Sequence, residues 1–144
     1  MYQKDYILRM VEMIGDLIAA FLGLLKKGDL DQAEKIIERG YIELLRNDAS
    51  FFLIIPKEQL TEKLIAEHHY EHFHLEILSE LFYAEGELAE ARHKPEHGLS
   101  CYEKSLILAE FLEQNDRTWS AKREERKENL RKKISGLRAS GSPQ

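Results

Sequence analysis

Cysteine, proline and long apolar runs are scarce in this sequence, and each scarcity excludes a class of protein. Only 3 of the 144 residues are proline and one, Cys101, is cysteine. A single cysteine cannot form an internal disulfide, which fits a reducing compartment or indifference to redox conditions. The longest stretch without charge, 17–25, is far shorter than the roughly 20 apolar residues of a membrane span. We therefore expect a cytoplasmic protein that does not enter a membrane.

The residues that are abundant favour helices. Hydrophobic residues make up 43% of the chain and charged residues 33%, with only 8 glycines. This composition is typical of a folded, helix-rich protein and not of a disordered one. A chain of this length forms one domain and can bury about 68–70% of its unfolded surface. We expect a single helical domain over 1–138 and a disordered tail over 139–144.

The first long helix is expected at 4–25, where apolar residues recur at steps of three and four. Two such stripes lie side by side, and past Asp16 the helix is apolar on nearly every side. Such a helix either lies at the centre of the fold or is shared with a second subunit. A membrane-surface helix is disfavoured because the polar face lacks the lysine and arginine residues of such helices. The stripe expected to form a homodimer seam consists of Ile7, Met10, Ile14, Leu17, Phe21 and Leu24. The neighbouring stripe consists of Leu8, Val11, Gly15, Ile18, Leu22 and Leu25.

Further helices follow along the chain, so that the expected fold is all-α with about six to seven helices. Gly28 is suited to end the first helix and Asp29 to begin the second. The apolar run 51–55, which ends at Pro56, is expected to form a short helical turn that fills the core. Whether 57–92 forms one kinked helix or two is left open by the pattern. The later helices are expected at 30–46, 57–67, 70–92, 96–113 and 117–137.

Charge is distributed unevenly between the body of the chain and its C-terminal helix. Residues 1–116 carry 12 basic and 23 acidic side chains, whereas 117–144 carry 9 basic and 3 acidic ones. The basic strip can dock onto acidic helices of the same chain, or it can bind a nucleic acid or an acidic partner. A nucleic-acid contact is disfavoured because glutamates interrupt the strip and Trp119 is its only stacking ring. The basic residues concerned are Lys122, Arg123, Arg126, Lys127, Arg131, Lys132 and Lys133.

Small residues recur in two predicted helical pairs, in the run 28–33 of the first pair and at Gly98 and Ser105 around Tyr102 in the second. The run 28–33 resembles the turn and small residue that open the second helix of a tetratricopeptide repeat, and Gly98, Tyr102 and Ser105 resemble the small–aromatic–small series of that repeat. The resemblance implies stacked antiparallel helical hairpins that bind a protein or peptide. The opening residues 1–6 are also similar to those of a family of small, uncharacterised bacterial helical proteins. The residues expected to line a binding groove are Tyr41, Phe73, Tyr83 and Tyr102.

Four of the six histidines lie within 68–74, the one place where the sequence suggests chemistry. On a continuous helix His68 and His72 would share a face and could hold zinc or another divalent metal. His68, Glu71 and His72 also match the letters of an inverted zinc-protease pattern, in which the glutamate is the general base. The alternatives are a structural histidine cluster, which we favour, and a weak metal site. No third acidic ligand follows at the distance that such proteases use.

These patterns together predict a function in binding rather than in catalysis. The chain lacks a phosphate-binding glycine loop, a nucleophile elbow and a cysteine–histidine pair with a supporting acid. We expect a non-enzymatic helical interaction or scaffold module with no cofactor, which binds a protein partner or a second copy of itself. The alternative is a small metal-binding protein or metal-dependent hydrolase that uses His68, Glu71 and His72.

Overall fold

The structure, a computed structural model, describes residues 4–116 and 121–141. Within these ranges the chain forms seven α-helices and no strands, which confirms the predicted all-α fold. The five long helices are α1 (Lys4–Lys26), α2 (Leu30–Leu45), α5 (His72–Ala91), α6 (Pro95–Asn115) and α7 (Ala121–Gly141). The short segments are α3 (Ala49–Leu53), the 3₁₀ turn η1 (Lys57–Gln59), α4 (Leu60–Glu62) and the π-helical turn η2 (Lys63–Glu67).

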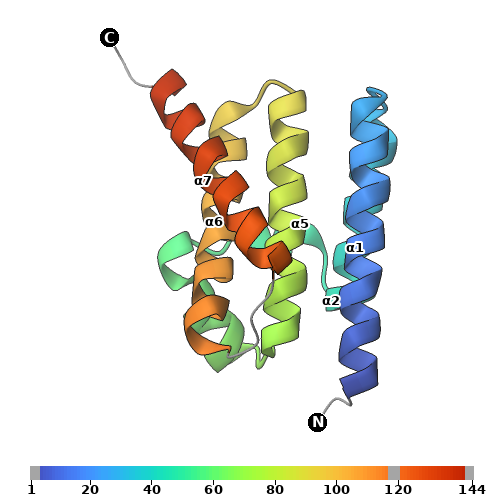
Figure 1. Cartoon of the computed structure of the whole chain (residues 1–144), viewed down its shortest axis with the longest axis vertical. Helices are drawn as coiled ribbons and strands as arrows, with labels where there is room; N and C mark the ends of the chain where they lie inside the picture. Colours follow the sequence, from blue (N-terminus) through green and yellow to red (C-terminus); the bar gives the residue numbers. More distant parts are fainter. Residues whose placement is uncertain (1–3, 117–120, 142–144) are drawn as a thin grey trace.

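Two antiparallel hairpins form the body of the molecule, α1 with α2 and α5 with α6 (Figure 1). The hairpins pack together because α5 contacts both α1 and α2. Helix α7 crosses the second hairpin obliquely, and α1 stands at the opposite edge of the molecule (Figure 1). The stacked-hairpin arrangement therefore leaves α1 with neighbours on only part of its surface.

The turn between α1 and α2 follows the local signals in the sequence. Gly28 adopts a left-handed conformation with φ of 80°, which a residue without Cβ tolerates best. The Asp29 carboxylate accepts a hydrogen bond from the Gln32 backbone N–H at 3.3 Å and so caps α2. Both roles agree with the predictions for these residues.

The apolar run after α2 forms the short helix α3, as predicted, and fills the core. The Asp48 carboxylate caps α3 by accepting from the Phe51 N–H at 3.1 Å. Phe52 is fully buried and its ring packs against those of Tyr41 and Tyr70. Helix α3 thus closes the core beside α2.

Residues 57–91 form two separate helical segments rather than one kinked helix. The chain runs through η1, α4 and η2 and leaves helical geometry at 68–71 before α5 begins. His69 takes a left-handed φ of 57° at this break. Tyr70 then donates a hydrogen bond from its hydroxyl to the Leu45 carbonyl oxygen at 3.1 Å, while its ring packs on Phe52. These contacts of Tyr70 with α2 and α3 hold the chain in its non-helical path.

Helices α5 and α6 approach closely where glycines face each other. Gly98 lies so near the Gly86 carbonyl oxygen that a Cβ at Gly98 would be 3.3 Å from it. The Tyr102 ring covers Gly86, and the Tyr102 hydroxyl donates to the Glu90 carboxylate at 2.6 Å. A small residue and an aromatic ring therefore pack against each other in the second hairpin.

We expect Gly86→Ala to lower the free energy of unfolding by about 1–3 kcal/mol, the usual cost of overpacking a core. The new Cβ would lie 2.5 Å from the Tyr102 ring, so the ring must move. This cost exceeds the gain of up to about 1 kcal/mol from better helix propensity. Urea unfolding measures the change, with Gly136→Ala as the control because no atom lies within 4 Å of its new Cβ. If Gly86→Ala were stabilised as much as Gly136→Ala, the close approach of Gly86 to the Tyr102 ring would be contradicted.

The basic strip on α7 docks onto the acidic helices α5 and α6, which confirms the intramolecular alternative for this strip. Its cations form ion pairs with glutamates of both helices. The pairs are Arg123–Glu76, Arg126–Glu80 and Lys133–Glu87 with α5, and Lys127–Glu113, Arg131–Glu110 and Arg138–Glu103 with α6. The strip is therefore largely occupied within the chain.

The described part of the C-terminal helix, α7, runs further than predicted at its C-terminal end. The expected start at Arg117 lies outside the described residues, which resume at Ala121. The expected disordered tail is wrong for 139–141, because α7 continues to Gly141. The Ser140 hydroxyl donates to the Gly136 carbonyl oxygen at 3.0 Å, within the helix. Small polar residues suggested a tail here but do not prevent this last turn.

Candidate functional site

The histidine cluster does not form the predicted two-ligand clamp. His68 follows η2 and its ring contacts Phe51, whereas His72 is the first residue of α5 and its ring contacts Phe111. The break at 68–71 therefore removes the one-turn spacing that a continuous helix would give. The Glu71 backbone N–H donates to His74 Nδ1 at 3.0 Å, a contact at the start of α5. No group of three or more metal-ligating side chains is arranged around one point anywhere in residues 4–116 or 121–141.

The four aromatic residues predicted to line a groove belong to the core instead. Tyr41 and Tyr102 are fully buried, and Phe73 and Tyr83 retain less than a tenth of their exposure. Small neighbours such as Gly86 let the rings sink between helices, so they are covered rather than presented. This corrects the expectation that these residues contact a partner.

The stripe of α1 predicted to form a dimer seam also faces the core. Met10, Ile14 and Phe21 are buried, and Ile7, Leu17 and Leu24 are partly buried against the same cluster. Helix α1 is not central, because its close neighbours are α2 and α5. The residues predicted to form the dimer seam therefore pack against α2 and α5 of the same chain. Other faces of α1 are exposed.

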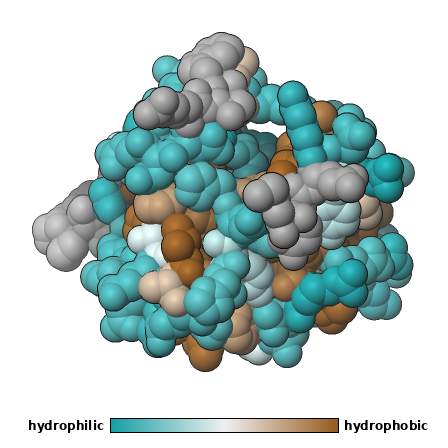
Figure 2. Space-filling model, turned by 90° about the horizontal axis from the view of Figure 1, so that it is seen from below, coloured by the Kyte–Doolittle hydropathy of each residue, from teal (hydrophilic) through white to brown (hydrophobic). Residues whose placement is uncertain are grey.

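Large apolar side chains are exposed mainly on the first half of α1. Of the six exposed large hydrophobic residues in the described parts of the chain, four lie within Tyr6–Met13: Tyr6, Leu8, Val11 and Met13. Leu8 is 52% exposed and Val11 36%. Figure 2 views the molecule from the end at which α1 begins, and there apolar surface emerges between hydrophilic side chains. Helical spacing places Leu8 and Val11 on one side of α1 and Tyr6 and Met13 on another, so the exposed residues form two small groups.

Leu8, Val11, Gly15 and Ala19 share one side of α1, which we call the α1 flank. Their spacing places them along a single line of the helix. No atom lies within 4 Å of a Cβ built at Gly15, so the space in front of this residue is open. The α1 flank is therefore apolar at one end and recessed at the other.

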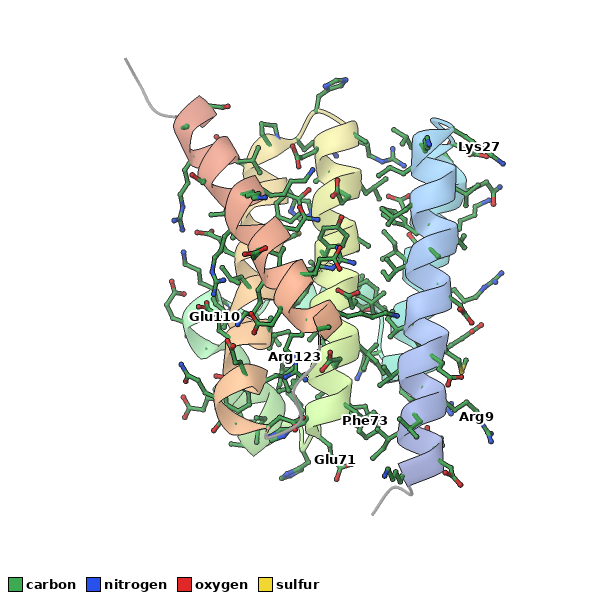
Figure 3. All side chains as sticks on the ribbon, viewed as in Figure 1. Arg9, Lys27, Glu71, Phe73, Glu110 and Arg123 are labelled. Atoms are coloured by element: carbon green, nitrogen blue, oxygen red, sulfur yellow. The ribbon has the colours of Figure 1, made fainter. Side chains whose placement is uncertain are left out.

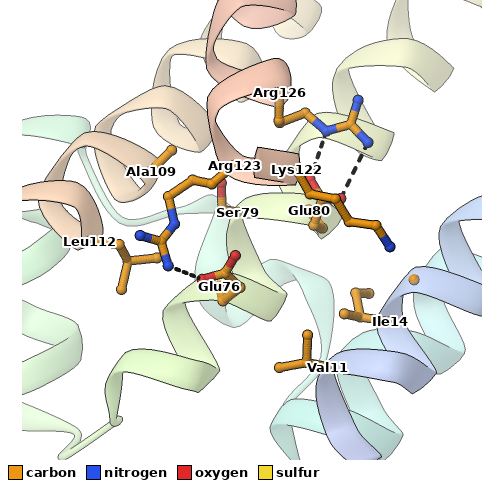
Figure 4. A pocket seen from close by; sticks show the side chains of 11 residues that line it. Val11, Ile14, Glu76, Ser79, Glu80, Ala109, Leu112, Lys122, Arg123 and Arg126 are labelled. Atoms are coloured by element: carbon orange, nitrogen blue, oxygen red, sulfur yellow. Dashed lines mark hydrogen bonds and ion pairs between the residues drawn. The ribbon is translucent and has the colours of Figure 1, made fainter. Parts of the chain in front are cut away.

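The α1 flank forms one wall of a groove whose floor is α5 and whose other wall is α7 (Figure 4). Two adjoining cavities, of about 110 and 280 Å³, make up this α1–α7 groove. Both are lined by Gly15, Glu80, Lys122 and Arg126. The first cavity also reaches Val11, and the second reaches Ala19.

The α7 wall of the groove is held rigidly by ion pairs with α5. Arg126 donates to Glu80 through Nε at 2.8 Å and Nη2 at 3.2 Å, and its guanidinium lies 3.7 Å from the centre of the Tyr83 ring. Arg123, mostly buried, donates to Glu76 at 2.7 Å. The dashed contacts in Figure 4 show both pairs. The exposed Lys122 has no ion-pair partner in the described ranges and extends toward α1 in the same view.

A second polar site lies between α2 and α5. Burial raises the pKa of the Glu85 carboxyl to about 7; the Tyr41 hydroxyl opposes this rise, and the nearby Glu34 and Glu38 carboxylates add to it. Burial, with the nearby Glu85 carboxyl, also raises the pKa of the Tyr41 hydroxyl. Burial also raises the pKa of the neighbouring Cys101 thiol to about 12, so Cys101 is a buried apolar residue rather than a nucleophile. The raised pKa of Glu85 makes this site a contributor to the pH dependence of stability.

The two apolar stripes of α1 are visible in the sequence, but periodicity alone does not show which stripe lines the groove. Leu8, Val11 and Gly15 belong to the second apolar stripe of α1, but two adjacent stripes do not show which one faces the core. The combination of exposed large residues with Gly15 and Ala19 on one line distinguishes the α1 flank. Lys122 was recognised only as part of the basic strip.

Comparisons with protein-family models, with curated proteins and with solved structures found no match for this chain. The resemblance to tetratricopeptide repeats therefore stays a prediction. Among the helices in the described ranges, none combines the length and the apolar character that crossing a bilayer requires.

Proposed function

We propose that this protein is a non-enzymatic helical interaction module and that its contact surface is the α1 flank with the adjoining α1–α7 groove. The observation that carries the proposal is the exposure of Leu8 and Val11 on one side of α1, directly beside the open groove that Val11, Gly15 and Ala19 line. Removing such residues from water is the main driving force of protein association. The paired hairpins supply a rigid support for this surface.

The polar groups of the groove support binding rather than catalysis. Glu76 and Glu80 are engaged by Arg123 and Arg126, which leaves their carboxylates in structural ion pairs. A general base or a metal ligand needs a carboxylate that can reach substrate or ion. The tetratricopeptide-like pairing of helices agrees with a binding role, and the single buried Cys101 agrees with the cytoplasmic location that we propose.

Site-specific photo-crosslinking tests the contact surface. A photoreactive amino acid at Val11 should form covalent adducts in cells of the source organism, because Val11 is exposed on the α1 flank and lines the groove. The same amino acid at Ile42 is the control, since Ile42 is 55% exposed on α2 but isolated from the groove. Adducts from Val11 alone, of any mass, support the proposal. Equal labelling at both positions, or none at Val11, contradicts it.

A further inference from the structure

We propose that a cleft between α6 and α7 binds a small amphipathic carboxylate, of which a medium-chain fatty acid is the simplest example. This site goes beyond the proposed function, because it shares no residue with the α1 flank or the α1–α7 groove. We call it the α6–α7 cleft. Its volume of about 510 Å³ exceeds that of either cavity of the groove and lies within the roughly 300–1,000 Å³ of small-molecule sites.

Each helix contributes one face to the α6–α7 cleft, because the lining residues recur at steps of three and four. Both faces carry charged residues at their two ends and smaller or apolar residues between them. Figure 3 shows Glu110 on the side of the molecule away from α1. The face of α6 consists of Glu103, Leu106, Ile107 and Glu110, and the face of α7 consists of Arg131, Ile134, Ser135 and Arg138.

Ion pairs between the helices close the cleft at both ends. Glu103 pairs with Arg138 at 2.6 Å at one end. Glu110 pairs with Arg131 at 3.8 Å at the other. The two pairs are seven residues apart on each helix, which corresponds to roughly 10 Å. A longer peptide or a helix would have to break one of these pairs to lie along the cleft, so its dimensions suit a small molecule.

The floor of the cleft is apolar. Leu106 and Ile107 are partly buried, and Ile134 is 5% exposed. Ile107 packs on the main core, whereas Leu106 packs with Ile134 in a second apolar cluster under α7. The small, exposed Ser135 leaves room above this floor. An apolar ligand body in this space removes the remaining surface of Leu106 and Ile107 from water, which favours binding.

Lys57 of η1 supplies the positive charge for the head group of the ligand. Its half-exposed Nζ lies 3.3 Å from the Glu103 carboxylate oxygen that Arg138 already binds more closely. Glu58 lines the same end of the cleft but interacts with the buried Lys104. The ammonium group of Lys57 therefore keeps N–H donors that an incoming carboxylate can accept. The ligand carboxylate lies at this end, and its apolar body extends along the floor.

Octanoate and its neutral analogue octanol test the charge requirement on the full chain, with affinities taken from amide NMR titrations. The wild type should bind octanoate more tightly than octanol. Lys57→Glu should weaken octanoate binding about tenfold, because it replaces an attraction with a repulsion, and should leave octanol binding unchanged. Lys132→Glu makes the same charge change at an exposed position of α7 outside the cleft, and it should alter neither affinity.

Filling the cleft tests its location. Ser135→Phe places a ring over the apolar floor and should abolish octanoate binding. Ser140→Phe, on another side of α7, is the control and should bind octanoate as the wild type does. In the wild type, octanoate should shift the amide signals of Leu106, Ile107 and Ser135 most strongly. Circular dichroism of each variant checks that these exposed substitutions leave the fold intact.

Four results would each overturn the proposal. They are a wild type without signal changes at millimolar octanoate, signal changes centred on the α1 flank, a Ser135→Phe variant that binds as the wild type does, and a Lys57→Glu variant that loses affinity for octanol and octanoate equally. The Val11 crosslink tests the proposed function separately, since the two sites have no residue in common.

Discussion

Replacing Glu85 with glutamine is expected to raise the free energy of unfolding at pH 8 by roughly 3 kcal/mol. Burial raises the pKa of this carboxyl from 4.5 to about 7 in the folded chain, and each pKa unit corresponds to about 1.4 kcal/mol. Glutamine has nearly the same shape and never ionises. The variant therefore avoids the cost of a buried negative charge beside Glu34 and Glu38.

The sign of the effect follows from linkage between protonation and folding. Below pH 4.5 Glu85 is protonated in both states, so its contribution to stability is fully present. As the pH rises toward 7, the unfolded chain releases the proton and the folded chain keeps it, and this stability is lost. Urea unfolding at pH 5 and pH 8 should thus show a gain for Glu85→Gln mainly at pH 8.

Glu128→Gln makes the matched control for this experiment, because Glu128 is an exposed carboxyl on α7. It should leave the pH dependence of stability as it is in the wild type. An equal effect of Glu85→Gln at both pH values would show that the carboxyl is not shifted by burial between α2 and α5.

Phe52→Ala is expected to lower the free energy of unfolding by about 3–5 kcal/mol, the usual cost of truncating a buried aromatic ring. Phe52 is fully buried in α3 and contacts the rings of Tyr41, Phe51 and Tyr70. The cavity left by the ring would separate α3 from α2 and from the Tyr70 anchor. Thermal and urea unfolding measure the loss.

The same short segment supplies the control for this substitution. Ile54 lies two residues further on and is 78% exposed, so Ile54→Ala should change stability by no more than about 0.5 kcal/mol. Similar effects of the two substitutions would mean that α3 does not fill the core.

The sequence predicted the elements whose limits depend on local chemistry. Gly28 and Asp29 mark the turn between α1 and α2, and the helix expected at 96–113 is found as α6 over Pro95–Asn115. The prediction that the basic strip of α7 can dock onto acidic helices of the same chain is confirmed. Opposite charges attract wherever the fold brings them together. Capping residues act over a few positions, and the net charge of a helix is a simple sum. Both can therefore be read from a single sequence.

Features that depend on tertiary packing could not be predicted. The break at 68–71 results from contacts of Tyr70 with Leu45 and Phe52, which are distant in sequence, so the histidines were placed on a helix that does not continue. Burial of Tyr41 and Tyr102 depends on how closely helices approach. The choice between the two stripes of α1 likewise depends on where α5 packs.

Photo-crosslinking from two sides of the same helix tests most directly the claim that the α1 flank carries the contact surface. The account predicts covalent adducts from Leu8 and Val11, which lie on the flank, and none from Met13, which is 43% exposed on another side of α1. Adducts from Met13 as abundant as those from Val11, or none from either flank position, would contradict the account.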